Sequence, residues 1–108
     1  MTVLTTTLGD RVSVDLYGPD GAPGAVFIQG AGLGRSEDPI PTETARMIAE
    51  LGYQASVHDR VGRGDSAAPG PISIEREIAA IRAISDRLGA PVVLVGHSSG
   101  CALAILGW

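Results

Sequence analysis

Residues 96–100 read Gly-His-Ser-Ser-Gly, a spacing of glycine and serine that suits nucleophilic chemistry. The segment follows the apolar run 92–95 and precedes the small, apolar run 101–106, which predicts a sharp turn from a buried strand into a helix. Such a turn strains the backbone of its serine and holds the hydroxyl exposed, as a nucleophile requires. The two glycines make room for the turn because they carry no side chains. We therefore interpret Ser98 as a candidate nucleophile.

A strand–turn–helix connection that merely contains glycines and serines would show the same five residues. The strand before the motif and the helix after it favour the nucleophile interpretation. Neighbouring side chains on a sharp turn diverge, so we expect His97 to pack against adjacent strands and not to act on Ser98.

Composition excludes several classes of protein. The chain of 108 residues has the size of one small domain, and its net charge of −4 gives no reason to expect nucleic acid or an anionic membrane as a partner. The single cysteine, Cys101, excludes an internal disulfide, and its apolar neighbours predict a buried small residue. Residues 1–7 lack the basic and apolar regions of a signal peptide, and no run is long enough to cross a bilayer. We therefore expect a soluble, cytoplasmic protein.

Apolar strand patterns alternate with amphipathic helix patterns along the chain. This alternation predicts an α/β fold with three-layer αβα architecture and a mostly parallel sheet. The expected strands are 3–7, 11–17, 25–28, 53–58 and 92–95, and the expected helices are 42–51 with Thr42 as its cap, one between Ser73 and Gly89, and one from about 101.

Three polar residues stand at the ends of expected strands. Gln29, Asp59 and Ser98 each follow an apolar run. Ligands in sheets of this kind bind at the carboxyl ends of the strands, so these residues mark the expected site.

Three motifs, in this order, resemble the N-terminal half of an α/β-hydrolase. Besides the turn at 96–100, the loop 29–32 (Gln-Gly-Ala-Gly) resembles the family's His-Gly loop. Residues 59–66 (Asp-Arg-Val-Gly-Arg-Gly-Asp-Ser) resemble its D-x-x-G-x-G-x-S stretch. The chain departs from the family in having Gln29 where histidine is usual. The resemblance implies the sheet order 1-2-4-3-5.

The resemblance also implies a role for each matching residue. Ser98 is expected to be the nucleophile of a serine hydrolase that cleaves an ester or related acyl bond through an acyl-enzyme. The backbone N–H groups of Ser99 and Ala31 are expected to form the oxyanion hole, while Asp59 and Arg60 organise their loop. Relatives with aspartate at the centre of the turn (dehalogenases and epoxide hydrolases) or cysteine there are disfavoured. The implied partner is a small-molecule acyl or ester substrate, and no cofactor is expected.

On this resemblance, residues 1–108 form the N-terminal part of a single domain whose C-terminal half, with the triad acid and histidine, is absent. We therefore expect little activity from this chain alone. The alternative is a non-catalytic remnant or interaction module of the same origin, because an uncovered sheet edge favours self-association.

Other motifs carry less weight. The glycines at 30 and 32 match part of a dinucleotide-binding loop, but Arg35 replaces its third glycine. Lysine is absent, which excludes a phosphate-binding P-loop. The tripeptide Arg-Gly-Asp at 63–65 is interpreted as a coincidental loop pattern and not as a receptor ligand. Metal binding is disfavoured because ligand spacing is lacking among His58, His97 and Cys101.

Overall fold

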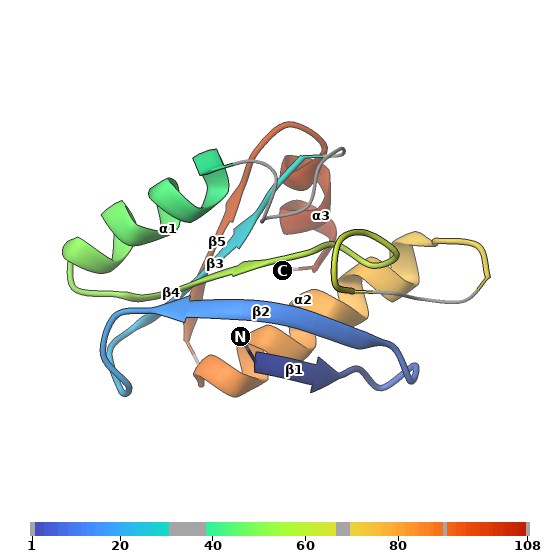
Figure 1. Ribbon diagram of the computed structural model, residues 1–108, viewed down its shortest axis with the longest axis horizontal. Coiled ribbons are helices and arrows are strands. Elements are labelled where there is room, and N and C mark those ends of the chain that lie inside the picture. Colours follow the sequence, from blue (N-terminus) through green and yellow to red (C-terminus); the bar gives the residue numbers. More distant parts are fainter. Residues whose placement is uncertain (1, 31–38, 67–69, 90, 108) are drawn as a thin grey trace.

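The computed structural model describes residues 2–30, 39–66, 70–89 and 91–107. Strands and helices alternate after an N-terminal pair of strands (Figure 1). The elements are β1 (Thr2–Thr5), β2 (Arg11–Tyr17), β3 (Gly24–Ile28), α1 (Pro39–Glu50), β4 (Gln54–His58), α2 (Ile74–Leu88), β5 (Val92–Gly96) and α3 (Ser99–Gly107).

The five strands form one sheet in the order β1-β2-β4-β3-β5, as the family resemblance implied. β3 pairs in parallel with β4 on one side and with β5 on the other. β2 pairs antiparallel with β1 and with β4. Four strands therefore run in one direction and only β2 is reversed. The expected α/β fold with a mostly parallel sheet is confirmed.

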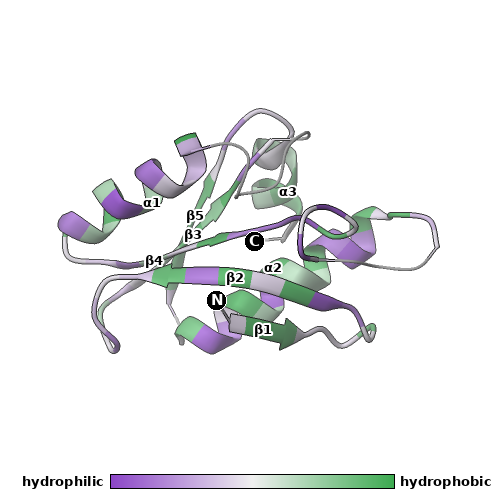
Figure 2. Cartoon of the chain, viewed as in Figure 1, coloured by the Kyte–Doolittle hydropathy of each residue, from purple (hydrophilic) through white to green (hydrophobic). Residues whose placement is uncertain are grey.

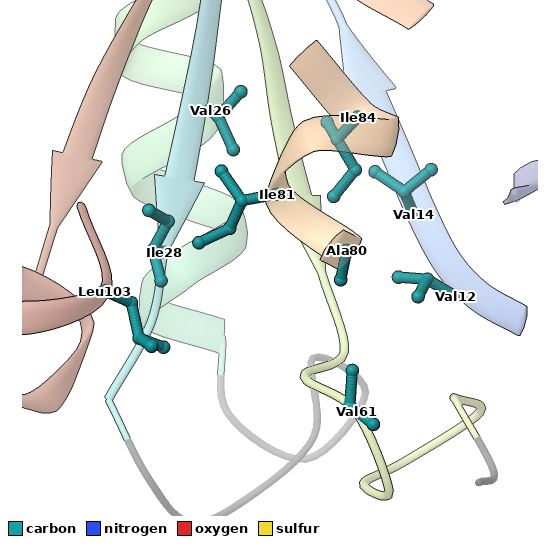
Figure 3. Packing of buried hydrophobic residues seen from close by; sticks show 9 residues of the cluster. All are labelled: Val12, Val14, Val26, Ile28, Val61, Ala80, Ile81, Ile84 and Leu103. Atoms are coloured by element: carbon teal, nitrogen blue, oxygen red, sulfur yellow. The ribbon is translucent and has the colours of Figure 1, made fainter. Parts of the chain in front are cut away.

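Helices cover both faces of this sheet, which gives the expected three layers (Figure 1). α1 packs over β4, while α2 and α3 pack on the opposite face against β3 and each other. On the α2 face, Ile81 of α2 and Leu103 of α3 lie over Ile28 of β3 (Figure 3). Full burial of such a side chain stabilises the fold by about 1.5–3 kcal/mol.

Hydropathy follows the same layers. In Figure 2, α1 and α2 alternate between hydrophilic and hydrophobic residues, as helices with one covered face should. α3 carries no charged residue, yet Ile105 and Leu106 on it are exposed. α1 and α2 thus pack on the sheet by their apolar sides, whereas α3 buries Leu103 and also leaves apolar side chains exposed.

The ends of α2 agree with the prediction. The Ser73 hydroxyl oxygen accepts a hydrogen bond from the Arg76 backbone N–H at 3.2 Å, which satisfies one of the unpaired donors of the first turn. Glu75 and Glu77 lie in that turn, where the helix dipole favours acidic side chains. Gly89 ends the helix with a φ of 84°, a conformation that glycine adopts easily.

Several element boundaries differ from the prediction by one to three residues. α1 begins at Pro39, three residues before the expected cap at Thr42. Proline is well tolerated in a first helical turn, whose N–H groups have no partner within the helix, so Pro39 and Pro41 extend the helix and do not delay it. β1 ends at Thr5 because the Thr6 hydroxyl accepts hydrogen bonds from the backbone of the following turn.

Candidate active site

The carboxyl ends of β3 and β5 bring the loop after residue 28 beside the turn at 96–100. Ile28 is aligned with Gly96 in the parallel ladder, and the His97 N–H donates to the Ile28 carbonyl oxygen at 3.0 Å. A Cβ placed on Gly30 would lie 3.1 Å from the Ser98 Cβ. Gln29 and Ser98 were predicted to lie at the carboxyl ends of their strands, on the same side of the sheet. The structure confirms this prediction.

Ser98 lies at the tip of the turn between β5 and α3. Its φ is 56°, and within the described residues it is the one non-glycine residue with a positive φ. That conformation costs about 1–2 kcal/mol for an L-residue. The Cys101 N–H donates to the Ser98 carbonyl oxygen at 2.9 Å and closes the first turn of α3. The Ser98 side chain is exposed, as the strained turn was expected to leave it.

Neither glycine of the motif has room beside it for a side chain. A Cβ on Gly96 would lie 2.6 Å from the Gly100 carbonyl oxygen. A Cβ on Gly100 would overlap the carbonyl oxygen of Ile28 on the neighbouring strand. Because the obstacles are backbone atoms, they cannot rotate away. Sequence reasoning had assigned these glycines the same role.

A cavity of about 390 Å³ opens beside Ser98. Its described walls come from β3, β5, the turn and the first turns of α1, and none of the described lining residues is Asp, Glu or Arg. His97 also lines it and is exposed, so the expectation that His97 packs against adjacent strands is wrong. The other lining residues are Phe27, Gln29, Gly30, Ile40, Pro41, Thr44, Val95 and Gly96.

Ser99 is the first residue of α3, so its backbone N–H lies at the positive end of the helix dipole. An anion held near Ser98 would meet this end of the helix. Ala31, the other residue predicted to supply an oxyanion amide, lies outside the described residues.

Asp59 organises the loop that follows β4, as predicted. Its carboxylate accepts a hydrogen bond from the Asp65 N–H at 2.9 Å, and a Cβ on Gly64 would overlap it. The loop is also fixed to β2, because the Ser13 N–H donates to the Ser66 hydroxyl oxygen at 2.9 Å. The glycine in this motif thus allows the chain to fold closely around a buried carboxylate.

Arg60 does more than organise this loop. Its Nη1 donates to the Ser99 hydroxyl oxygen at 2.8 Å and to the Gln29 carbonyl oxygen at 3.4 Å. Its other nitrogens bond the Glu77 carboxylate. Sequence reasoning missed this connection to the turn, for which the only signal was an arginine two residues after a buried strand.

Gln29 also links two strands. It is 4% exposed, and its side-chain Nε2 donates to the His58 carbonyl oxygen at 3.1 Å. The glutamine side chain therefore ties the end of β3 to the end of β4. This hydrogen bond helps to hold Gln29 and the adjoining Gly30 beside the turn.

Cys101 is exposed, which contradicts the prediction of a buried residue. Its Sγ lies 3.1 Å from the Gly96 carbonyl oxygen. The reason is the orientation of α3, which buries Leu103 and leaves the side that carries Cys101 open to solvent.

His58 does not lie where a base for Ser98 would be expected. It is 2% exposed at the end of β4, and β3 separates β4 from β5. Two strand spacings put His58 about 10 Å from the β5 backbone. His97 adjoins Ser98 in the chain and lines the same cavity. Among the described residues there is also no group of three or more His, Cys, Asp or Glu that could hold a metal ion.

Comparison with known proteins identifies the family. The model of the alpha/beta hydrolase family matches residues 25–107. The chain therefore belongs to the α/β-hydrolase family. Among curated proteins no significant match is found.

Solved structures agree with this assignment. An α/β hydrolase from Sphaerobacter thermophilus is 29% identical with a TM-score of 0.84, over 98% of this chain and 39% of that one. Epoxide hydrolase A from Mycobacterium thermoresistibile is 27% identical with a TM-score of 0.78, over 98% and 33% of the two chains. An esterase from Exiguobacterium antarcticum shares the fold. It is 22% identical with a TM-score of 0.81, over 98% of this chain and 38% of that one. The chain thus spans well under half the length of these structures.

No helix in the described part of the chain is both long and apolar enough to cross a membrane.

Proposed function

We propose that the complete protein containing this chain is a serine hydrolase, which cleaves an ester or related acyl bond through an acyl-enzyme on Ser98. The observation that carries this proposal is the backbone of Ser98, with a φ of 56° on an exposed turn beside a cavity. A serine held in this strained position serves nucleophilic chemistry, since strain of this kind is retained where function needs it.

The proposed reaction has two halves. In the first, Ser98 Oγ attacks the carbonyl carbon of the substrate and gives its proton to a base. The oxyanion that forms accepts hydrogen bonds from the Ser99 and Ala31 N–H groups, each worth about 3 kcal/mol of barrier in comparable sites. The intermediate collapses, and the leaving alcohol or thiol departs with a proton. In the second half, water attacks the acyl-Ser98 ester and releases the acid.

The base is proposed to lie outside residues 1–108. The position of His58, buried on β4 with β3 between it and the turn, supports this. The activity proposed here is therefore that of the complete protein.

The cavity indicates an uncharged acyl group as substrate. Its described walls carry aromatic and aliphatic side chains, with Phe27, Ile40 and Val95 as the largest apolar members. A buried charge on the substrate would find no opposite charge among these described residues. A serine at position 98 also favours acyl transfer over the chemistry of relatives that use aspartate there.

The single exposed Cys101 suits a reducing compartment, and we propose the cytoplasm.

A fluorophosphonate probe tests the proposal, because it reacts with activated serines. We expect the complete natural polypeptide to be labelled and to hydrolyse p-nitrophenyl esters, and Ser98→Ala to lose both. Ser85→Ala removes a serine hydroxyl on α2 that does not line the cavity, and this matched variant should retain labelling. Labelling that survives Ser98→Ala would place the nucleophile elsewhere. A folded protein with neither labelling nor turnover would support the alternative, a non-catalytic interaction module.

A further inference from the structure

The Arg60 guanidinium lies between three elements that are distant in the sequence. It is in contact with Glu77 on α2, with the carbonyl of Gln29 at the end of β3, and with the hydroxyl of Ser99 at the start of α3. The side chains of Arg60 and Glu77 are 8% and 6% exposed. A buried charge in this place requires an explanation, because it is costly to remove from water.

Glu77 fixes the orientation of the Arg60 side chain. Arg60 Nε donates to both Glu77 carboxylate oxygens, at 3.2 and 3.0 Å, and Nη2 forms a close ion pair with Oε2. A planar guanidinium held by two of its nitrogens has little freedom left. Nη1, the remaining nitrogen, is therefore directed at Ser99 and Gln29.

Both contacts of Nη1 are made to segments of the proposed oxyanion hole. Ser99 supplies one of the two N–H groups, and Gln29 leads into the loop that supplies the other. The two segments are seventy residues apart in the chain, and one cation is bonded to both. The position of the Ser99 end of α3 relative to the end of β3 therefore depends on this guanidinium.

We propose that Arg60, oriented by Glu77, is a positioning residue that fixes the Ser99 donor of the proposed oxyanion hole against the end of β3. This inference rests on the proposed function. Arg60 does not line the cavity beside Ser98, so it acts through Ser99 and the Gln29 carbonyl and not on the substrate. A displacement of about 1 Å in such a donor can cost about 10²-fold in rate.

The energetics of the ion pair favour this role. A buried ion pair adds little net stability, because the loss of hydration offsets the attraction, and well-packed apolar residues of similar volume often serve as well. Stability alone therefore gives little reason for the pair. Lysine would not replace Arg60, because its single ammonium lacks the planar fork that contacts Glu77 and Ser99 together.

Two variants of the complete natural polypeptide separate positioning from stability. Ser99→Ala removes the hydroxyl that Arg60 bonds and leaves both the Ser99 N–H and the ion pair in place. The double variant Arg60→Met/Glu77→Leu removes both partners of the pair, and the partly exposed Arg63 then loses its 3.8 Å contact with Glu77. Arg76→Met is the control, since Arg76 pairs with Asp10 and contacts neither Ser99 nor Gln29.

The measurements are kcat and KM for a p-nitrophenyl ester, Tm, and the affinity of a trifluoromethyl ketone, which forms a tetrahedral adduct with an active serine. For Ser99→Ala we expect kcat and ketone affinity to fall about tenfold, the factor of one hydrogen bond. For the double variant we expect a fall of about 10²-fold. KM should change little, and Arg76→Met should lower Tm without changing kcat.

The outcomes are distinct. The positioning role would be overturned if Ser99→Ala and a folded double variant both kept the wild-type kcat and ketone affinity. It would also be overturned if these variants lowered Tm and left the ketone affinity unchanged. If the double variant does not fold, Ser99→Ala decides alone, because its ion pair is intact. Full turnover by Ser98→Ala would instead overturn the proposed function, and this inference with it.

Discussion

Arg76 and Asp10, which are 66 positions apart in the sequence, form a two-pronged ion pair between α2 and the turn after β1. Arg76 Nη2 lies 2.6 Å from Asp10 Oδ1, and Nε lies 2.9 Å from Oδ2. Arg76 Nη1 also donates to the Pro71 carbonyl oxygen at 2.7 Å. The pair therefore holds the first turn of α2, and the segment before it, against the N-terminal hairpin.

This pair should make stability depend on pH. The hydrogen bonds from Arg76 lower the pKa of the Asp10 carboxyl below its ordinary value of about 4, and the charge of Arg76 adds to this, against the effect of burial. A carboxyl with a lowered pKa stabilises the folded state above the unfolded pKa, and this contribution is lost as pH falls through the folded value. We expect Asp10→Asn to lower Tm at pH 7 and the difference to vanish between pH 4 and pH 2.

Thermal unfolding followed by circular dichroism from pH 2 to 7 tests this. Asp86→Asn is the matched control, because it removes the same charge from the exposed surface of α2. It should change Tm little at any pH. A Tm difference for Asp10→Asn that is as large at pH 2 as at pH 7 would contradict the ion-pair explanation.

Gly100→Ala should damage the turn through space alone. Gly100 is not among the glycines with positive φ, so alanine meets no backbone penalty there, but its Cβ would overlap the Ile28 carbonyl oxygen. Because that oxygen is fixed by the β3–β5 ladder, we expect a loss of about 3 kcal/mol in the free energy of unfolding. Urea unfolding measures it.

Gly21→Ala is the control for this substitution. Gly21 has a φ of 85° with nothing within 4 Å of the added Cβ, so it reports the cost of left-handed backbone alone, about 1 kcal/mol. Equal losses in the two variants would show that the Gly100 overlap relaxes easily, against this prediction.

Much of the fold was predictable because its determinants are local. The alternation of apolar strands with amphipathic helices, and the capping Ser73, depend on residues close in sequence. The turn at 96–100 was predictable for the same reason. The strand order came from the family resemblance and not from the pattern itself.

What the sequence did not show depends on distant residues. The Arg60 contacts join positions 17 to 39 residues apart, which no local pattern reveals. The exposure of Cys101 depends on which side of α3 meets the sheet. The early start of α1 reflects a weakness of local rules, because proline breaks a helix in its interior but suits its first turn.

The isolated chain of residues 1–108 is expected to self-associate. In the described residues β5 pairs only with β3, Val93 on β5 is 50% exposed, and Ile105 on α3 is 76% exposed. An apolar strand edge next to an apolar helix surface favours pairing with another copy. We expect concentration-dependent oligomers in analytical ultracentrifugation, together with binding of a hydrophobic dye.

A charge on the edge should prevent this association. Val93→Lys should shift the chain toward monomer, because lysine on an edge strand opposes pairing. Val3→Lys on β1, the other edge of the sheet, is the matched control and should leave association unchanged. A strictly monomeric wild-type chain at high concentration would contradict the prediction.

Residues 1–108 alone are also expected to show little or no hydrolysis. A triad base must lie within about 2.6–3.2 Å of the serine oxygen, often more without substrate. His58 is buried two strands from the turn. His97 is expected to diverge from Ser98, because neighbouring side chains on a sharp turn point apart. An oxyanion hole and binding without a base leave residual catalysis of about 10³–10⁴ over water, far below a full triad.

The test is turnover of p-nitrophenyl acetate by purified, folded 1–108, compared with its Ser98→Ala variant. We expect the two rates to agree within about tenfold, because unaided Ser98 is a weak nucleophile. Robust turnover that Ser98→Ala abolishes would prove the prediction wrong. The base would then be one of two residues, and His97→Ala and His58→Gln would distinguish them. Loss of turnover in His97→Ala alone would assign the role to the exposed histidine of the cavity, since His58 is enclosed by β2 and β3.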